Sequence, residues 1–96
     1  MIKHIVMWTY RKEDRDETIK TLKSMFDELQ GKIDGLLRLE IGINTVPDAA
    51  ACDMVLYSEF EDWSALEFYQ NHPDHQRIKE YTAPRRRSRH QVDYEC

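Results

Sequence analysis

The hydrophobic period changes several times along this chain, and the order of those changes constrains the fold more than any single motif. Apolar residues fall on alternate positions where strands are expected and recur every three or four positions where helices are expected. The expected strands are residues 1–10, 36–44, 54–60 and 90–95, and the expected helices run from Asp14 to Gly31 and from Asp62 to Pro84. This β-α-β-β-α-β order predicts a single domain over residues 1–96 with an α+β ferredoxin-like fold, in which the helices cover one face of the sheet.

Capping residues set the expected ends of the first helix. Asp14 is expected to cap it, and Glu17 three residues later completes the pattern of a capping box. Gly31 and Gly35 are expected to end it. The apolar stripe between these ends comprises Ile19, Leu22, Met25, Phe26, Leu29 and Ile33.

The second helix is expected to be broken. Asp62 is a good cap, and Pro73 suits the first turn of a further helical segment because its missing N–H is not needed there. Trp8 on the first strand and Trp63 and Phe68 on this helix are expected in the core.

One face of the sheet is expected to stay uncovered, because both helices lie on the other. Strand spacing and rise give this face an area of roughly 400 Å². Ile5, Met7, Val55 and Tyr57 are expected on it. An apolar patch of that size is near the limit that a monomer leaves bare, so we expect a homodimer that pairs sheet to sheet.

The charge distribution argues against nucleic-acid and membrane partners. The net charge is −4, and the basic block RRRSR at residues 85–89 is the one exception. A block of this kind is usually a solvated face or the C-terminus of a helix. No apolar run is long enough to span a bilayer.

The two cysteines indicate a reduced, cytoplasmic location. Cys52 and Cys96 are too few for a disulfide framework, and neither has the spacing of a metal site. The N-terminal residues predict a strand and not a signal peptide.

Four segments together resemble the stress-responsive dimeric α/β-barrel (Dabb) family. They are IKHIVMW at 2–8, VLYSEF at 55–60, YQNHPDHQ at 69–76 and VDYE at 92–95. The resemblance covers nearly the whole chain. It implies the ferredoxin-like fold and a barrel formed by two sheets across a dimer. Members include stress-associated proteins without an assigned reaction and a cofactor-free polyketide cyclase.

The resemblance to that cyclase also implies a site. Its catalytic histidine is similar to His75, its partner tyrosine is similar to Tyr69, and two further histidines match His72 and His4. The implied ligand is an aromatic or polyketide-like small molecule, and no cofactor is implied. A neutral imidazole can act as the base at physiological pH, and a tyrosine hydroxyl can donate to a developing oxyanion.

Other interpretations of the same residues stay open. His72 can cap the helix segment that starts at Pro73, and His75 can bond a strand carbonyl, which would make the chain a non-catalytic homodimer with structural histidines. A metal held by His72 and His75 would need a third ligand, for example Asp74, and is not expected. Related sheet dimers also carry monooxygenases, so cofactor-free oxidation of an aromatic substrate is a third interpretation.

Overall fold

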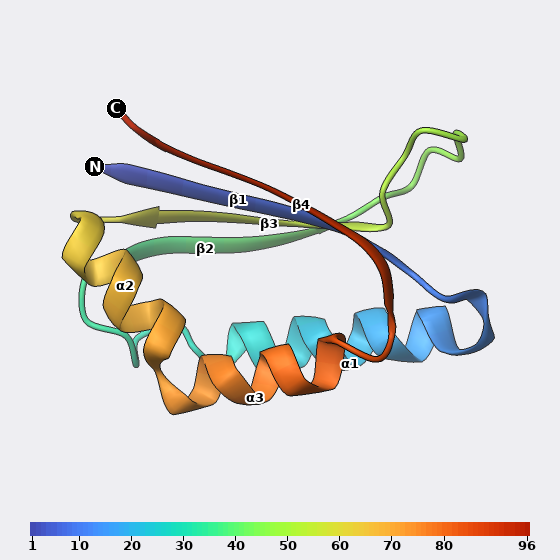
Figure 1. Ribbon diagram of the computed structural model, residues 1–96, viewed down its shortest axis with the longest axis horizontal. Helices are drawn as coiled ribbons and strands as arrows, with labels where there is room; N and C mark the ends of the chain where they lie inside the picture. The colour runs from blue at the N-terminus through green and yellow to red at the C-terminus, as the bar shows by residue number, and fades with distance from the viewer.

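Antiparallel strands form one four-stranded sheet in the order β2-β3-β1-β4, and all the helices lie against one of its faces (Figure 1). The computed structural model describes residues 1–96. Its elements are β1 (Ile2–Tyr10), the 3-10 turn η1 (Lys12–Asp14), α1 (Arg15–Asp27), β2 (Leu36–Ile43), β3 (Met54–Phe60), α2 (Trp63–Asn71), α3 (Pro73–Thr82) and β4 (Arg86–Glu95). The predicted ferredoxin-like fold is confirmed, with the second helix broken at Pro73 as expected.

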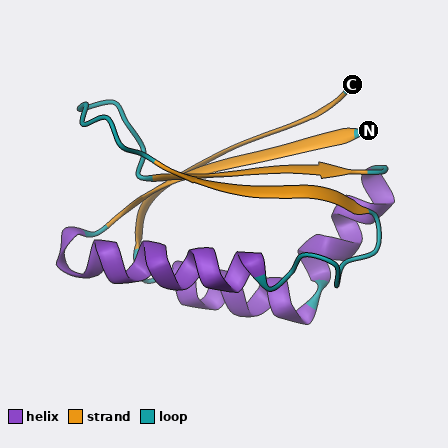
Figure 2. Cartoon of the chain, turned by 180° about the vertical axis from the view of Figure 1, so that it is seen from behind, coloured by secondary structure: helices purple, strands orange, loops and turns teal.

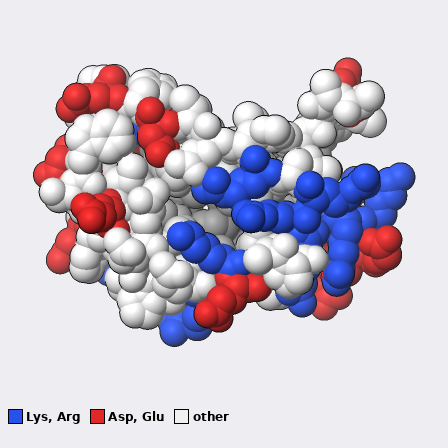
Figure 3. All heavy atoms as spheres, viewed as in Figure 1, with Lys and Arg blue, Asp and Glu red and all other residues white.

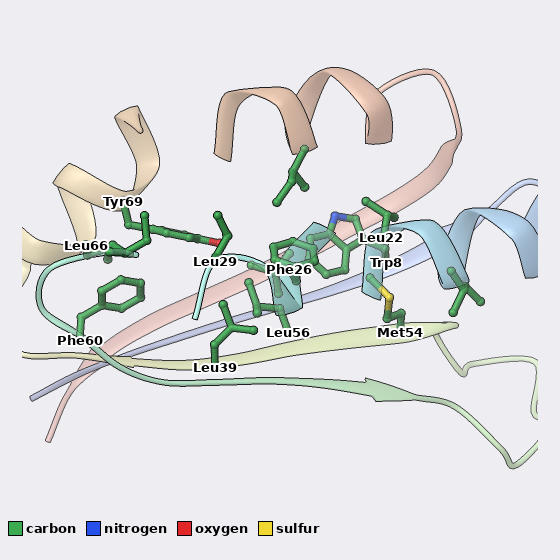
Figure 4. Close-up of a cluster of buried hydrophobic side chains, with 14 of the residues drawn as sticks. Trp8, Leu22, Phe26, Leu29, Leu39, Met54, Leu56, Phe60, Leu66 and Tyr69 are labelled. Atoms are coloured by element: carbon green, nitrogen blue, oxygen red, sulfur yellow. The ribbon is translucent and has the colours of Figure 1, made fainter. Parts of the chain in front are cut away.

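Seen from behind, the same two layers are clear, and the connection over residues 44–53 extends past the end of the sheet (Figure 2). The core lies between the layers and comprises a cluster of 16 buried apolar residues (Figure 4). No helix has the length and apolar character needed to cross a bilayer.

The start of α1 differs from the expected capping box. Asp14 occupies the N-cap position, but its side chain makes no cap hydrogen bond. Instead its two carboxylate oxygens accept from Nε and Nη2 of Arg11 at 2.9 and 2.8 Å. The charged fork of Arg11 therefore competes successfully for the carboxylate that would otherwise cap the helix.

The end of α1 comes earlier than the apolar stripe predicts. The helix stops at Asp27, and turns carry Leu29 and Ile33 into the core, where they are 2% and 5% exposed. Gly35 has φ +84°, and a Cβ there would lie 2.5 Å from Cβ of Ala65. A glycine is required at this point because both the backbone angle and the approach of α2 exclude a side chain.

β2 contains an extra residue that the alternation did not predict. Leu36 pairs with Phe60 and Arg38 with Glu59, so Leu37 has no partner across the ladder. Leu37 is 53% exposed, whereas Leu39, which an unbroken alternation would place on the same face, is 7% exposed. This bulge resets the alternation of the strand.

Two of the three aromatic residues expected in the core are not there. Trp8 is 5% exposed, but Trp63 and Phe68 are each 50% exposed. α2 is short and buries only Leu66 and Tyr69. Phe68 lies about 100° around the helix from Tyr69 and therefore faces away from the sheet.

β4 starts four residues before the expected strand and takes in most of the basic block, but Arg86, Arg87 and Arg89 are exposed there, which agrees with the expected solvated face. Arg86 pairs with Tyr10 and Arg89 with Trp8, which places both arginines in the sheet. Arg85 alone lies at the end of α3, where its Nη1 donates to the carbonyl of Tyr81 at 2.8 Å. β4 is an edge strand, a position where charged side chains are common.

The sheet face opposite the helices is uncovered in the single chain, as expected. The residues predicted on this open face do lie there: Ile5, Met7, Val55 and Tyr57. β4 adds Val92 and Tyr94, which are 50% and 42% exposed and pair with Ile5 and Lys3. Met7 is 41% exposed. The patch is thus wider than the sequence alone indicates.

Candidate functional site

A cavity of about 600 Å³ lies between the sheet and the two segments of the broken helix. It opens as a recess on the side of the molecule where α2, α3 and β4 meet (Figure 3). The lining residues are His4, Val6, Trp8, Phe26, Leu56, Gln70, Asn71, His75, Ile78, Lys79, Thr82, Ala83, Arg86, Arg89 and Gln91. The volume is in the range of small-molecule sites.

His75 forms part of the cavity wall. The break at Pro73 turns the chain so that Nδ1 of His75 lies 3.3 Å from the carbonyl oxygen of Gln70. A carbonyl oxygen only accepts, so Nδ1 carries the proton and Nε2 keeps the lone pair. Nε2 has no protein partner and is not among the fully enclosed polar atoms. Burial lowers the pKa of His75 to about 4, despite the bond to Gln70, and the ring is neutral at physiological pH.

Tyr69 packs against His75 but lies behind the cavity wall. The two ring centroids are 4.2 Å apart. The side chain of Tyr69 is completely buried, surrounded by apolar residues such as Leu66 and Leu29 (Figure 4). Its hydroxyl has no hydrogen-bond partner in the protein, and burial raises its pKa, which keeps the phenol neutral.

His4 lies on the sheet side of the same cavity. Its Nδ1 is 2.5 Å from Oδ1 of Asp93, and its ring centroid is 6.1 Å from that of Tyr69. The carboxylate accepts from Nδ1–H, so Nε2 holds the lone pair here as well. Burial lowers the pKa of His4, and the bond to Asp93 opposes the shift. Asp93 also accepts from Nε2 of Gln91 at 2.7 Å.

The structure therefore brings together three of the four predicted site residues: His4, Tyr69 and His75. His72 lies apart from the cavity. Its Nδ1 accepts from the backbone N–H of Asp74 at 3.1 Å, so the ring caps α3 as the structural interpretation expected. The other structural expectation, that His75 bonds a strand carbonyl, is wrong because its partner is in α2.

Sequence reasoning missed Asp93 and the basic residues of the cavity. Asp93 pairs directly with His4 across the sheet, so the strand alternation that placed His4 could also have placed Asp93 on the same face. Lys79, Arg86 and Arg89 line the cavity, and no Asp or Glu does. Burial lowers the pKa of Arg89. The chain holds no group of three or more His, Cys, Asp or Glu side chains arranged for a metal ion.

Comparison with known proteins supports the family resemblance. The model of the stress responsive A/B barrel domain (Dabb) matches residues 2–96. A dimeric protein of unknown function with a ferredoxin-like fold from Bacteroides fragilis is 30% identical, with a TM-score of 0.90 over 99% of this chain and 95% of that one.

More distant solved structures share the fold alone. Hydroxynitrile lyase from Passiflora edulis is 16% identical, with a TM-score of 0.83 over 97% of this chain and 90% of that one. An antibiotic biosynthesis monooxygenase is 15% identical, with a TM-score of 0.80 over 100% of this chain and 98% of that one. No curated protein sequence matches the chain significantly.

Proposed function

The chain belongs to the stress responsive A/B barrel domain (Dabb) family, and from this premise we propose that it is a cofactor-free enzyme acting on a polyketide-like carbonyl compound. The observation that carries the proposal is the accessible Nε2 of His75, a neutral imidazole in the wall of a cavity of about 600 Å³. A structural histidine that only joined α2 to α3 would not need a free lone pair beside a cavity.

The low pKa of His75 narrows the substrate class. A pKa of about 4 keeps the ring in its base form at all physiological pH values, but it also makes the ring a weak base. Such a base removes only an activated proton, as on the carbon between two carbonyl groups. The 1,3-dicarbonyl unit of polyketide-like compounds has this property, and the apolar lining by Trp8, Phe26 and Leu56 suits an aromatic or alkyl body.

The proposed step conserves atoms and electrons. The C–H bond between the two carbonyls breaks, its proton moves to Nε2 of His75, and its electron pair forms an enolate. The enolate carbon forms a C–C bond to another carbonyl carbon of the same molecule, whose π electrons move to its oxygen. That alkoxide then takes the proton back from His75, so the cyclisation requires no oxidant or reductant.

Tyr69 and His4 support this step in the proposal. The hydroxyl of Tyr69 is an unpartnered donor beside His75 but is enclosed behind the cavity wall, so we assign it to the enolate oxygen of a ligand whose binding displaces the side chains between this hydroxyl and the cavity. His4, oriented by Asp93, is a second neutral imidazole and can receive or return a proton at the sheet side. His72 has no part in the step because it lies outside the cavity.

Hydrogen–deuterium exchange tests the proposal without knowledge of the natural substrate. The protein should speed exchange at the central carbon of 1-phenylbutane-1,3-dione in deuterated buffer, followed by NMR, and His75→Ala should return the rate to that of buffer. His75→Asn, which keeps a donor toward Gln70, guards against loss of folding in the alanine variant. His90→Ala removes a histidine outside the cavity lining and should keep the full rate. Exchange at the buffer rate with the wild-type protein contradicts the proposal.

A homodimer formed through the open face is part of the proposal. Covering roughly 400 Å² at about 25 cal/mol per Å² is worth up to about 10 kcal/mol per subunit before association costs. The related protein from Bacteroides fragilis is dimeric. The cavity is on the other side of the sheet, so pairing leaves its opening free. Cys52 and Cys96 are free thiols, which suits the cytoplasmic location that we also propose.

A non-catalytic homodimer is the second candidate. The observation in its favour is that both histidines of the HPDH segment make backbone bonds, His72 to Asp74 and His75 to Gln70. The exchange assay separates the two candidates. A monooxygenase is a third candidate and rests on the fold shared with the monooxygenase structure; consumption of oxygen with an aromatic substrate would favour it.

A further inference from the structure

The charges around the cavity are opposite in sign to those of the whole chain. The chain carries 18 acidic and 14 basic side chains, for a net charge of −4. The cavity lining nevertheless includes Lys79, Arg86 and Arg89 and no acidic residue. Basic side chains gather along the side of the recess formed by α3 and β4 in the space-filling view, and some acidic side chains lie near them (Figure 3). A lining with basic and no acidic residues is unexpected in an acidic protein.

The three cations come from two facing elements and converge on one opening. Arg86 and Arg89 pair across the sheet with the buried Tyr10 and Trp8, so both project from the helix-covered face of β4. Lys79 projects from α3 on the opposite wall.

None of the three head groups has a partner within the chain. Neither arginine nor the lysine forms an ion pair or a side-chain hydrogen bond, whereas Arg85 and Arg11 nearby are paired with Asp14. The carboxylate of Asp93 acts electrostatically on Arg89, but it is already bound by His4. Three unpaired cations at one opening repel one another, and an anion would relieve that repulsion.

The rest of the lining is half apolar and half polar: Val6, Trp8, Phe26, Leu56, Ile78 and Ala83 are apolar, and His4, Gln70, Asn71, His75, Thr82 and Gln91 are polar. Trp8, Phe26, Leu56 and Ile78 form the inner part. The cavity thus combines an apolar interior with a cationic rim, which is complementary to a molecule with an apolar body and one anionic end.

We propose that the cavity selects a substrate that carries a carboxylate, with Arg86 and Arg89 of β4 and Lys79 of α3 holding the carboxylate and the apolar body lying toward Trp8. The inference rests on the proposed function for the position of the reacting carbon at His75, and it adds the charge of the substrate. The planar forks of the two arginines match carboxylate and phosphate alike; we assign carboxylate, and comparison with a phosphate ligand tests that assignment. The carboxylate is a separate group from the carbonyls that react at His75. It orients the substrate and takes no part in the bond changes.

Calorimetric titration of matched ligands tests this selection. We expect 4-phenylbutyrate to bind at least about tenfold more tightly than 4-phenylbutyramide, which has the same shape without the charge, because charge-assisted hydrogen bonds are about twice as strong as neutral ones. Raising the salt concentration from 50 to 500 mM should weaken the binding of the acid and leave the affinity for the amide unchanged.

Variants of β4 provide a control that differs only in position. Arg89→Gln and Arg86→Gln should each abolish most of the preference for the acid. Arg87→Gln removes the same charge from the same strand at a residue outside the cavity lining and should keep the preference. Equal affinity for the acid and the amide, or the same loss in Arg87→Gln as in Arg89→Gln, would overturn the inference. Tighter binding of 4-phenylbutyl phosphate than of the acid by tenfold would overturn the assignment to carboxylate.

The exchange assay separates this inference from the proposed function. The neutral 1-phenylbutane-1,3-dione and its analogue with a terminal carboxylate can exchange with equal kcat/KM in the wild-type protein. This result would support the proposed enzymatic function and refute the selection of a carboxylate. Alternatively, neither compound exchanges, but the acid binds more tightly than the amide and Arg89→Gln removes that difference. This result would support the selection of a carboxylate and refute the proposed enzymatic function.

Discussion

Tyr69→Phe gives the sharpest test of the site, because it predicts a stability gain together with a loss of function. The hydroxyl of Tyr69 is buried and has no protein partner. An unsatisfied buried polar group costs about 1–3 kcal/mol, and its removal leaves a void no larger than one oxygen atom. We therefore expect the free energy of unfolding to rise by about 1 kcal/mol.

Tyr10→Phe is the matched control for this substitution. Tyr10 is 1% exposed and its hydroxyl is also without a partner, but it lies at the opposite end of β1 from His4 and lacks the ring contact that Tyr69 makes with His75. Both variants should gain stability by similar amounts in urea denaturation followed by circular dichroism, at one fixed protein concentration because a dimer couples stability to concentration. Only Tyr69→Phe should slow the exchange reaction, and a loss of about tenfold to a thousandfold is typical for one oxyanion donor.

Two results would refute the reasoning. A fall of 1 kcal/mol or more in Tyr69→Phe, with no fall in Tyr10→Phe, would mean that the Tyr69 hydroxyl is bonded in the native protein. An unchanged exchange rate in a variant that folds normally would mean that this hydroxyl does not donate to the enolate.

Three further predictions concern the histidines and the open face. The pKa of His75 falls from 6.5, its ordinary value, to about 4 in the folded protein. Between these two pH values the unfolded chain binds more protons than the folded protein. The contribution of His75 to the free energy of unfolding should therefore be fully present above pH 6.5 and be lost, by at most about 3 kcal/mol, as the pH drops toward 4. Urea titrations should show a smaller fall for His75→Gln, and an equal fall in both proteins contradicts the assignment. His72→Ala removes the cap of α3 and should cost about 1 kcal/mol with ligand binding intact, whereas His72→Asn restores the acceptor; equal stability of all three proteins would show that the cap contributes nothing. Val92→Glu places a charge on the open face, where Val92 is 50% exposed, and should convert a dimer to a monomer in sedimentation at micromolar concentration; a wild-type monomer refutes the proposed pairing.

Hydrophobic alternation predicted most of the fold because it reports directly on burial. β3 has the expected bounds, and the side chain of Asp62 caps α2 through the backbone N–H of Ala65 at 2.8 Å. The alternation gives the wrong burial where the pairing of two strands is irregular. Leu37 is exposed because a bulge resets β2, and no local pattern marks that bulge. Phe68 is exposed because α2 packs on the sheet through one stripe only, and that stripe consists of Leu66 and Tyr69.

The sequence predicted the site residues that lie close together along the chain and missed the contact between residues that lie far apart. Tyr69 and His75 are six positions apart, on either side of the break at Pro73, and the family resemblance identified them together. His4 and Asp93 are separated by 89 positions, and only the register of β1 with β4 brings them into contact. The alternation of the expected strand 90–95 gives the face on which Asp93 lies, but no local pattern gives the register of that strand against β1.

The error in the strand and the error in the site are therefore one error. Arg86 and Arg89 belong to the part of β4 that precedes the expected strand, and they face the helices because β4 continues to pair with β1 back to Tyr10. An edge strand built from hydrophobic residues would have been recognised from its alternation, but it would also have given the cavity an apolar rim. The same arginines that hide the strand from sequence reasoning give the cavity its positive charge, so the feature that the sequence made hardest to place is the one that most restricts what the cavity can bind.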